Sequence, residues 1–367
     1  MSSTAPGQHT ADEPVALPHH NGQRFRLIAG LAVLLALLFV GMVLHLTMGS
    51  VAIPPSAVWD FVNGNQIQGS FATILREIRL PRALTAIAAG LGLAISGLLM
   101  QTLFRNPLAG PSVLGITSGA SLGVAIIMLA FGNVAGTFAI QQLGLTGSWL
   151  IIVAASLGSG AIMFLIMVLA LYVRDHVTLL IIGIMVGYLT IALVSIWQFF
   201  SAPEQIQDYL IWTFGSLGGT TLSQLKILIP VVALGALLVF FLMKPLNALL
   251  LGEDYARSVG IEIRRARFWI IVATSVLAGS ITAFCGPIGF VGIAVPHLVR
   301  GLLGTNNHRQ LVPFTMLMGA VVLIFCDIVA KWPGSSSSLP ISAITSLLGA
   351  PVVIWIILRR RSMQSAF

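Results

Sequence analysis

Long stretches without charge constrain this chain more than any other feature of its sequence. Between residues 106 and 173 it carries no Asp, Glu, Lys or Arg. About 20 apolar residues, rising 1.5 Å each in an α-helix, cross the roughly 30 Å hydrocarbon core of a bilayer. Only 8% of the 367 residues are charged, whereas soluble domains carry about 25%. These values exclude a water-soluble globule and predict helices in lipid.

The apolar runs predict an all-α, polytopic membrane protein with about ten transmembrane helices. Gly286 and Pro287 argue for a break in the run 268–299. A loop near Gly144 to Gly147 separates two spans within 106–173. The expected spans are 27–47, 83–104, the two within 106–173, 177–200, 223–243, 267–285, 288–302, 311–331 and 339–358.

Two kinds of segment fall outside these spans. Residues 1–23 are polar and are expected to form a flexible cytoplasmic tail, followed by a single transmembrane domain over residues 24–367. Residues 54–80 and 203–219 mix polar residues with Trp, and we expect amphipathic segments at the membrane interface.

The positions of the basic residues predict the orientation in the membrane. With the N-terminus in the cytoplasm, most Lys and Arg residues fall on the cytoplasmic side, as is usual for membrane proteins. Both termini are therefore expected in the cytoplasm. The net charge of +8 reflects this bias and does not indicate nucleic-acid binding. The exceptions on the outer side are Arg76, Arg79, Arg82, Lys226 and Lys331.

Small residues and cysteines indicate packing. Gly115, Gly119 and Gly123 form one small-residue face, and Gly183 with Gly187 forms another; such faces let helices approach closely in lipid. The two cysteines lie in apolar runs without metal-ligand spacing. No metal site and no catalytic residue is expected.

Four motifs occur in order along the chain. They are Arg79-Leu-Pro-Arg82; Asn106-Pro-Leu-Ala-Gly-Pro-Ser-Val-Leu-Gly115; Leu251-Gly-Glu-Asp-Tyr-Ala-Arg-Ser-Val-Gly260; and Gly286-Pro-Ile-Gly-Phe-Val-Gly292, which runs into Pro296-His-Leu-Val-Arg300. Leu339-Pro-Ile341 and Leu348-Gly-Ala-Pro351 close the series.

This series resembles the FecCD-type permeases of binding-protein-dependent ABC importers over roughly residues 27–358. The resemblance implies a type II permease-like fold with ten spans and inverted repeats, formed by spans two to five and seven to ten. It implies a bacterial plasma-membrane protein, paired with a second copy of itself, that moves ferric siderophore, haem or cobalamin. Its other implied partners are two cytoplasmic ATPases, which bind ATP-Mg, and an extracytoplasmic binding protein.

The resemblance also assigns roles to residues. Segment 244–268 would couple the permease to the ATPase through Leu251, Gly252, Glu253, Asp254, Ala256, Arg257 and Gly260, with Glu253, Asp254 and Arg257 facing it. Gly260 suits a left-handed helix cap. Arg79, Arg82 and Lys331 would meet acidic residues of the binding protein, with membrane anchoring as the alternative for the arginines and pairing with Asp327 for the lysine.

Two Pro- and Gly-interrupted stretches are expected to break helices near the pathway. Their residues are Asn106, Pro107 and Gly115 in the first, and Gly286, Pro287, Gly289, Pro296 and His297 in the second. A lone His in a span is more often structural than a ligand. The pathway itself is expected along spans 177–200, the third and the tenth.

Other function classes fit less well. The chain has no Gly-x-x-x-x-Gly-Lys-Ser/Thr motif, so no ATP site or other cofactor is expected in it. A secondary transporter usually needs ionisable groups in mid-membrane, and here only Asp327, His45 and His297 come into question. An intramembrane protease would have to pair Ser121 with His297 and lacks an acid partner. An inert scaffold leaves the motifs unexplained.

Overall fold

The computed structural model describes residues 20–65, 69–130, 148–173, 175–331 and 338–364, and this part of the chain is helical. In chain order the elements are α1 (His20–Thr47), α2 (Pro55–Val62), α3 (Phe71–Thr73), the π-helical turn η1 (Ile74–Arg79), α4 (Leu80–Leu103), the 3₁₀ turn η2 (Pro111–Leu114), α5 (Ile116–Ala125), the π-helical turn η3 (Ile126–Ala130), α7 (Ser148–Tyr172), α8 (His176–Phe200), α9 (Pro203–Thr213), α10 (Leu222–Leu251), α11 (Glu253–Ser258), α12 (Ile263–Cys285), α13 (Val291–Leu303), α14 (His308–Ala330) and α15 (Ile341–Gln364).

The helices occupy the expected spans. Seven described helices are long and apolar enough to cross a membrane, and three shorter apolar helices lie at 116–129, 291–303 and 341–354. Two of the short ones, α5 and α13, follow the predicted Pro/Gly breaks. The loop expected at 144–147 and the tail residues 1–19 lie outside the described residues. Residues 20–23 were expected in that tail but already belong to α1.

Local sequence explains several helix starts. Thr221 and Gln224 form a reciprocal capping box at the start of α10, with N···O distances of 3.0 and 3.3 Å. The Asp175 carboxylate accepts a hydrogen bond from the Thr178 amide at 2.7 Å and caps α8. Asn307 accepts one from the Arg309 amide at 3.0 Å and caps α14. Each cap satisfies a backbone amide that the helix leaves free.

The core surrounds α4, which packs against α10, α12, α13 and α14. Glycines set these close approaches: a methyl group on Gly90 would lie 2.2 Å from the Gly319 carbonyl oxygen of α14. The predicted small-residue faces pack in the same way. Gly119 and Gly123 lie against Gly158 and Ala154 of α7. Helices α1 and α8 lie at the periphery and expose apolar side chains, as helices facing lipid do.

The packing repeats within the chain, as the expected inverted repeats require. Helix α4 packs on α13 and α14, and α12 packs in the same way on α5 and α7. One repeat would consist of α4, α5, α7 and α8, and the other of α12, α13, α14 and α15. The first helix of each repeat then packs on the second and third helices of the other repeat. The C-terminal end of α4 lies beside the α10–α11 junction, from which the chain enters α12, because the Arg105 guanidinium donates to the Leu249 carbonyl at 3.2 Å. Helices α4 and α12 therefore run in opposite directions.

One span boundary differs from the expectation. We expected the second span to begin at residue 83, with Arg79 before it and 54–80 as an interfacial segment. The structure has α2 as a separate helix, but Phe71–Leu103 is continuous. Proline usually marks a helix boundary, yet Pro81 lies in the first turn of α4, where it is tolerated, directly after the π-helical turn η1. Helix α9 is separate, as expected.

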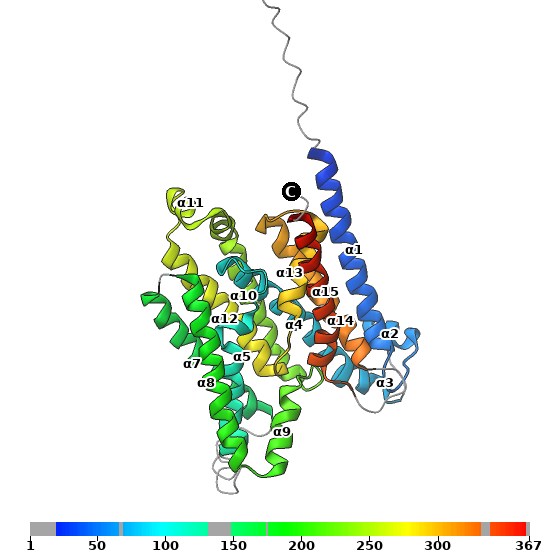
Figure 1. Cartoon of the computed structure of the whole chain (residues 1–367). Helices are drawn as coiled ribbons and strands as arrows, with labels where there is room; N and C mark the ends of the chain where they lie inside the picture. Colours follow the sequence, from blue (N-terminus) through cyan, green and yellow to red (C-terminus); the bar gives the residue numbers. More distant parts are fainter. Residues whose placement is uncertain (1–19, 66–68, 131–147, 174, 332–337, 365–367) are drawn as a thin grey trace, which may run out of the picture.

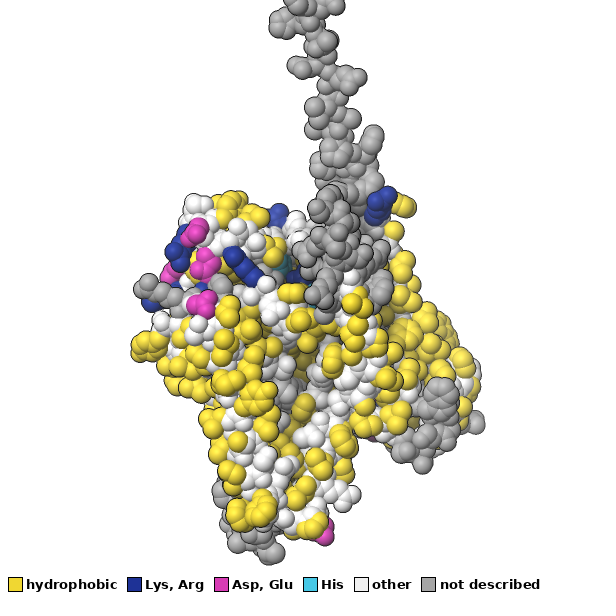
Figure 2. Space-filling model, in the orientation of Figure 1, with side chains coloured by type: hydrophobic (Ala, Val, Ile, Leu, Met, Phe, Trp, Pro, Cys, Tyr) yellow, Lys and Arg dark blue, Asp and Glu magenta, His cyan; other side chains and the backbone are white. Residues whose placement is uncertain are grey.

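Charged residues gather at one end of the molecule. In Figure 1 the start of α1, the end of α15 and the short helix α11 lie at the same end, with α2, α3 and α9 at the other. Figure 2 shows basic and acidic side chains concentrated over α11, above flanks that mix hydrophobic and uncharged groups and carry almost no charge on the visible face. This distribution distinguishes one charged end of the molecule from a body that carries few charges on this face.

Candidate functional site

The segment expected to couple to an ATPase forms a compact helical turn between two spans. Helix α11 ends in a hydrogen-bonded cap: the Ile261 amide donates to the Ala256 carbonyl at 2.9 Å, and the Gly260 amide donates to the Arg257 carbonyl at 3.0 Å. Gly260 has φ +83°, so the predicted left-handed cap is confirmed. Ala256 is fully buried beneath the turn, whereas Leu251 and Tyr255 are exposed.

The charged residues of this turn divide into two groups. Glu253 points inward: its carboxylate is 2.8 Å from the Arg267 guanidinium of α12 and 3.6 Å from that of Arg257. Glu253 is thus paired within the chain while 22% of its side chain stays exposed, and its contact with the ATPase remains a prediction. Asp254 is exposed, as is most of the Arg257 side chain. Asp254 and Arg257 thus face outward, as expected.

The turn is tied to spans on both sides. A guanidinium nitrogen of Arg267 lies 3.4 Å from the Val173 carbonyl oxygen, at the end of α7. Arg105, at the end of α4, donates to the Leu249 carbonyl of α10. A hollow of about 270 Å³, lined by both charged and apolar residues, lies between the end of α7 and helices α11 and α12. Glu253 thus joins α11 directly to α12, while the end of α7 is reached through Arg267 of α12 and the end of α4 through α10.

The two predicted helix breaks meet each other inside the bundle. Gly115 has φ +73° and Gly286 φ +72°, so both breaks use backbone geometry that favours glycine. The His297 Nε2 lies 2.6 Å from the Pro107 carbonyl oxygen, which joins α13 to the first break. His297 is buried and engaged in this contact, which supports the structural role expected of it. Pro296 lies inside α13 and breaks no helix.

The contact between α4 and α13 holds these breaks together. A methyl group on Gly97 would lie 1.8 Å from the Gly292 carbonyl oxygen, so the two backbones touch. The Gln101 amide donates to the Ile293 carbonyl at 3.1 Å, and Arg300 donates to the Gln101 side-chain oxygen. Asn106 caps its own turn, since its side-chain oxygen accepts from the Leu108 amide at 2.9 Å. Sequence reasoning did not identify Gln101 or Arg300.

The residues expected to dock a binding protein converge on a buried carboxylate at the opposite end. Arg82 donates two hydrogen bonds of 2.8 Å to the two Asp327 oxygens, and the Lys331 ammonium lies 3.6 Å from Oδ2. Asp327 is fully buried. His45 Nε2 approaches Asp327 Oδ2 at 2.7 Å. The alternative that Asp327 pairs with Lys331 is confirmed, and His45 contacts the same carboxylate.

Arg79 is also turned inward. It is 4% exposed and donates to the Leu46 and Val51 carbonyl oxygens at the end of α1. Burial lowers the pKa of Lys331 to about 8; the Asp327 carboxylate opposes this shift, and the charges of Arg82 and Arg79 add to it. Docking by Arg79, Arg82 and Lys331 remains a prediction, because in the single chain these cations serve contacts between helices.

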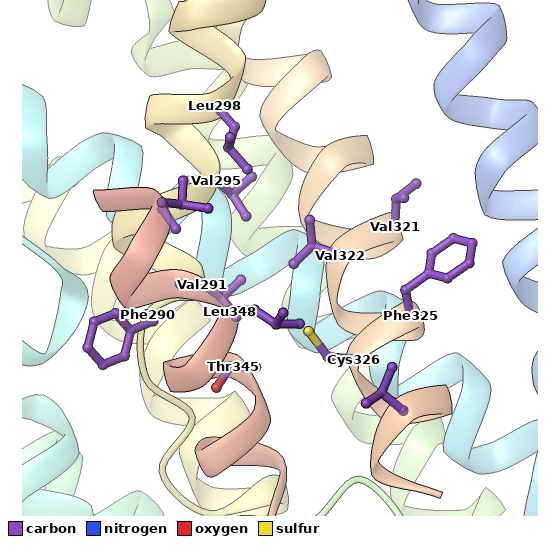
Figure 3. Close-up of a pocket in the computed structure, with 14 residues that line it drawn as sticks. Phe290, Val291, Val295, Leu298, Val321, Val322, Phe325, Cys326, Thr345 and Leu348 are labelled. Atoms are coloured by element: carbon purple, nitrogen blue, oxygen red, sulfur yellow. The ribbon is translucent and has the colours of Figure 1, made fainter. Parts of the chain in front are cut away.

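An apolar cavity of about 290 Å³ adjoins the second break. Figure 3 shows its lining from α13, α14 and α15: Phe290, Val291, Val295, Val322 and Leu348 surround it, with the Thr345 hydroxyl and the Cys326 sulfur among a few polar atoms. Cys326 and Cys285 are buried free thiols. Among the described residues no group of His, Cys, Asp and Glu could hold a metal ion.

Comparison with known proteins gives concordant matches. The model of the FecCD transport family matches residues 37–359. The hemin transport system permease protein HmuU of Yersinia pestis is 35% identical over 346 residues, covering 93% of this chain and 98% of that protein. The vitamin B12 import system permease protein BtuC of Klebsiella pneumoniae is 35% identical, covering 89% and 92%.

A solved structure is similar over nearly the same length. It is described as a metal-chelate type ABC transporter in an inward-facing conformation, and it superposes with a TM-score of 0.77 at 30% sequence identity. The match covers 90% of this chain and 98% of that one. Fold and sequence thus agree over almost the whole chain.

Proposed function

Because the chain belongs to the FecCD transport family and is the multi-pass permease subunit of an ABC importer, we propose that it forms the pathway for a ferric siderophore or haem. An external binding protein delivers this cargo, and two cytoplasmic ATPase subunits drive its passage. The permease pairs with a second copy of itself. It provides the route and no ATP site of its own.

The construction of the α10–α11–α12 turn carries this proposal. The turn presents Asp254, Arg257 and the exposed apolar residues Leu251 and Tyr255. Mixed charged and apolar surfaces of this kind suit a protein partner. Behind this surface, Glu253 and Arg267 connect α11 to α12 and the end of α7. An ATPase that moves α11 would therefore shift transmembrane helices, which is the requirement for coupling.

The orientation follows from the same end of the molecule. Helix α11 and both ends of the described chain lie together (Figure 1), and an ATPase works in the cytoplasm. We therefore place the termini in the cytoplasm of the bacterial plasma membrane. The excess of basic residues at this end supports the same orientation.

The choice of cargo rests on the relatives. The hemin permease matches 93% of this chain, which supports an iron chelate, and the solved relative is described as a transporter of the metal-chelate type. Cobalamin is the alternative, since a vitamin B12 permease is equally identical. Ferric siderophores, haem and cobalamin are all bulky metal complexes. A largely neutral, apolar pathway would suit the passage of each.

At the outer end, we propose that Arg82 and Lys331 help to dock the binding protein. Both are held by Asp327, with side chains 14% exposed. A carboxylate of the binding protein would have to share these cations with Asp327. Arg79 is buried and donates hydrogen bonds to backbone carbonyls. It would contribute by stabilising the outer end of the molecule.

Uptake into proteoliposomes distinguishes the cargoes. The chain is purified with the ATPase that accompanies it, reconstituted with its binding protein, and supplied with labelled ferric siderophore, haem or cobalamin. The proposal predicts ATP-dependent uptake of the siderophore or of haem. Uptake of cobalamin alone would overturn the assignment of cargo and leave the permease function intact.

A further inference from the structure

A groove runs between the first helix and the second repeat. Helix α1 packs along α14, but near its N-terminal end a space of about 720 Å³ opens between α1, the end of α13 and the start of α14. Leu34 and Phe314 in the groove are 5% exposed, whereas Val33 and Leu302 at its margins are 57% and 72% exposed. The groove is therefore open at the surface and apolar inside.

The length of the groove matches one leaflet of a bilayer. On α1 it extends from Arg26 to Leu37, which corresponds to about 16 Å at 1.5 Å per residue. The hydrocarbon core of a membrane is about 30 Å thick, so one leaflet contributes about 15 Å. The walls thus remain apolar over the depth that one acyl chain occupies.

The mouth of the groove is polar and basic. Arg26 lies at the end nearest the N-terminus, facing Thr305 and Gln310 across the opening. Arg26 is exposed, and it makes no ion pair or side-chain hydrogen bond within the part of the chain that the structure describes. A cation and neutral hydrogen-bonding groups above an apolar slot complement a phosphate with an attached acyl chain.

We propose that this groove binds an anionic phospholipid from the leaflet on the side of the termini. The phosphate contacts Arg26, with Gln310 and Thr305 as further hydrogen-bonding groups. One acyl chain lies between α1 and α13 over Phe314. The bound lipid would complete the contact between the peripheral first helix and the rest of the bundle.

The headgroup contact is tested with a charge variant and a matched control. The full-length protein is purified in detergent with equal amounts of phosphatidylglycerol and phosphatidylethanolamine, and retained lipid is counted by native mass spectrometry. Arg26→Ala should reduce the preference for phosphatidylglycerol about fivefold, the effect of one cation near a membrane surface. Arg309→Ala removes an exposed arginine at the same end that does not line the groove and should retain the preference. An equal preference in both variants would overturn the proposal.

The acyl-chain contact is tested by filling the groove. Val33→Trp places a large side chain in it, and Leu35→Trp places the same side chain on an exposed position of α1 outside it. The proposal predicts loss of the tightly retained lipid in Val33→Trp only. Equal retention in the two variants would contradict it. Retention that appears only after deletion of residues 2–19 would identify the chain's own N-terminal segment as the occupant and would also overturn it.

Discussion

The buried carboxylate of Asp327 joins three helices. It belongs to α14, receives Arg82 from α4 and contacts His45 from α1. His45 can donate a hydrogen bond to this carboxylate only if its Nε2 atom carries a proton. A protonated Nε2 cannot also accept a hydrogen bond from the Lys331 ammonium, which lies 3.2 Å from it. Lys331 is therefore bound to Asp327 by charge. A buried carboxylate with cations on two sides holds these helices in register.

Asp327→Ala should lower the free energy of unfolding by about 3–5 kcal/mol, because it leaves Arg82 unpaired where little water can reach it. Thermal unfolding in detergent measures the change. Asp208→Ala removes an exposed acidic side chain and should change stability by less than about 0.5 kcal/mol. A similar effect of both substitutions would show that the ion pairs of Asp327 do not stabilise the fold.

Gly97→Ala should destabilise the protein although alanine favours helices more than glycine does. The added methyl group would meet the Gly292 carbonyl oxygen at 1.8 Å, and backbone cannot give way as a side chain can. We expect a loss of at least about 1–3 kcal/mol in thermal unfolding. Gly160→Ala in α7, where nothing lies within 4 Å of the new methyl group, should be neutral or stabilising; a comparable loss there would refute the packing argument.

At the residue scale, the sequence predicted the backbone conformation of single residues better than it predicted which side chains contact each other. The φ of Gly260 followed from its place after a charged helix. The pairing of Glu253 with Arg267 did not, because the two residues flank a turn whose geometry the sequence does not specify. Likewise, His45 and Asp327 are 282 positions apart, and no local pattern connects them.

At the scale of elements, two substitutions in α11 distinguish a role in coupling from a role in stability, because Asp254 is exposed and Glu253 forms an ion pair. Asp254→Arg alters an exposed charge and should uncouple ATP hydrolysis from uptake while the protein still inserts and folds. Glu253→Arg should also lower the unfolding temperature, since it places a cation beside Arg267. Parallel assays of uptake, ATPase activity and thermal unfolding distinguish the two. Normal uptake in Asp254→Arg would contradict the assignment of α11 as the segment that couples to the ATPase.

The helix breaks were predictable as elements, but their meeting was not. Gly and Pro signalled interruptions at 106–115 and after Cys285, and the structure has both. Pro296 did not end its helix, because prolines inside transmembrane helices are tolerated when neighbouring groups satisfy the backbone. The second span was predicted too short because it was begun after Arg82, where the charge-free run starts, whereas the helix extends back through Pro81 and the π-helical turn η1.

At the scale of the whole molecule, the apolar runs predicted about ten spans, where the described residues have seven membrane-length helices and three shorter apolar ones. The distribution of basic residues predicted the orientation, and the resemblance supplied the repeats. Orientation is open to direct measurement. A cysteine at Ser258 in α11 should react with a membrane-impermeant maleimide only from the cytoplasmic side, and one at Gln207 in α9 only from outside. The native thiols Cys285 and Cys326 are each 2% exposed and should contribute little background. The reverse labelling pattern would invert the topology.

The most direct test of the account measures what drives uptake. Proteoliposomes containing the permease, its ATPase and its binding protein are given labelled cargo with ATP, or with a proton gradient and no ATP. We predict uptake with ATP alone, lost in Asp254→Arg although the complex remains assembled. Uptake by the permease alone, driven by the proton gradient, would contradict the account.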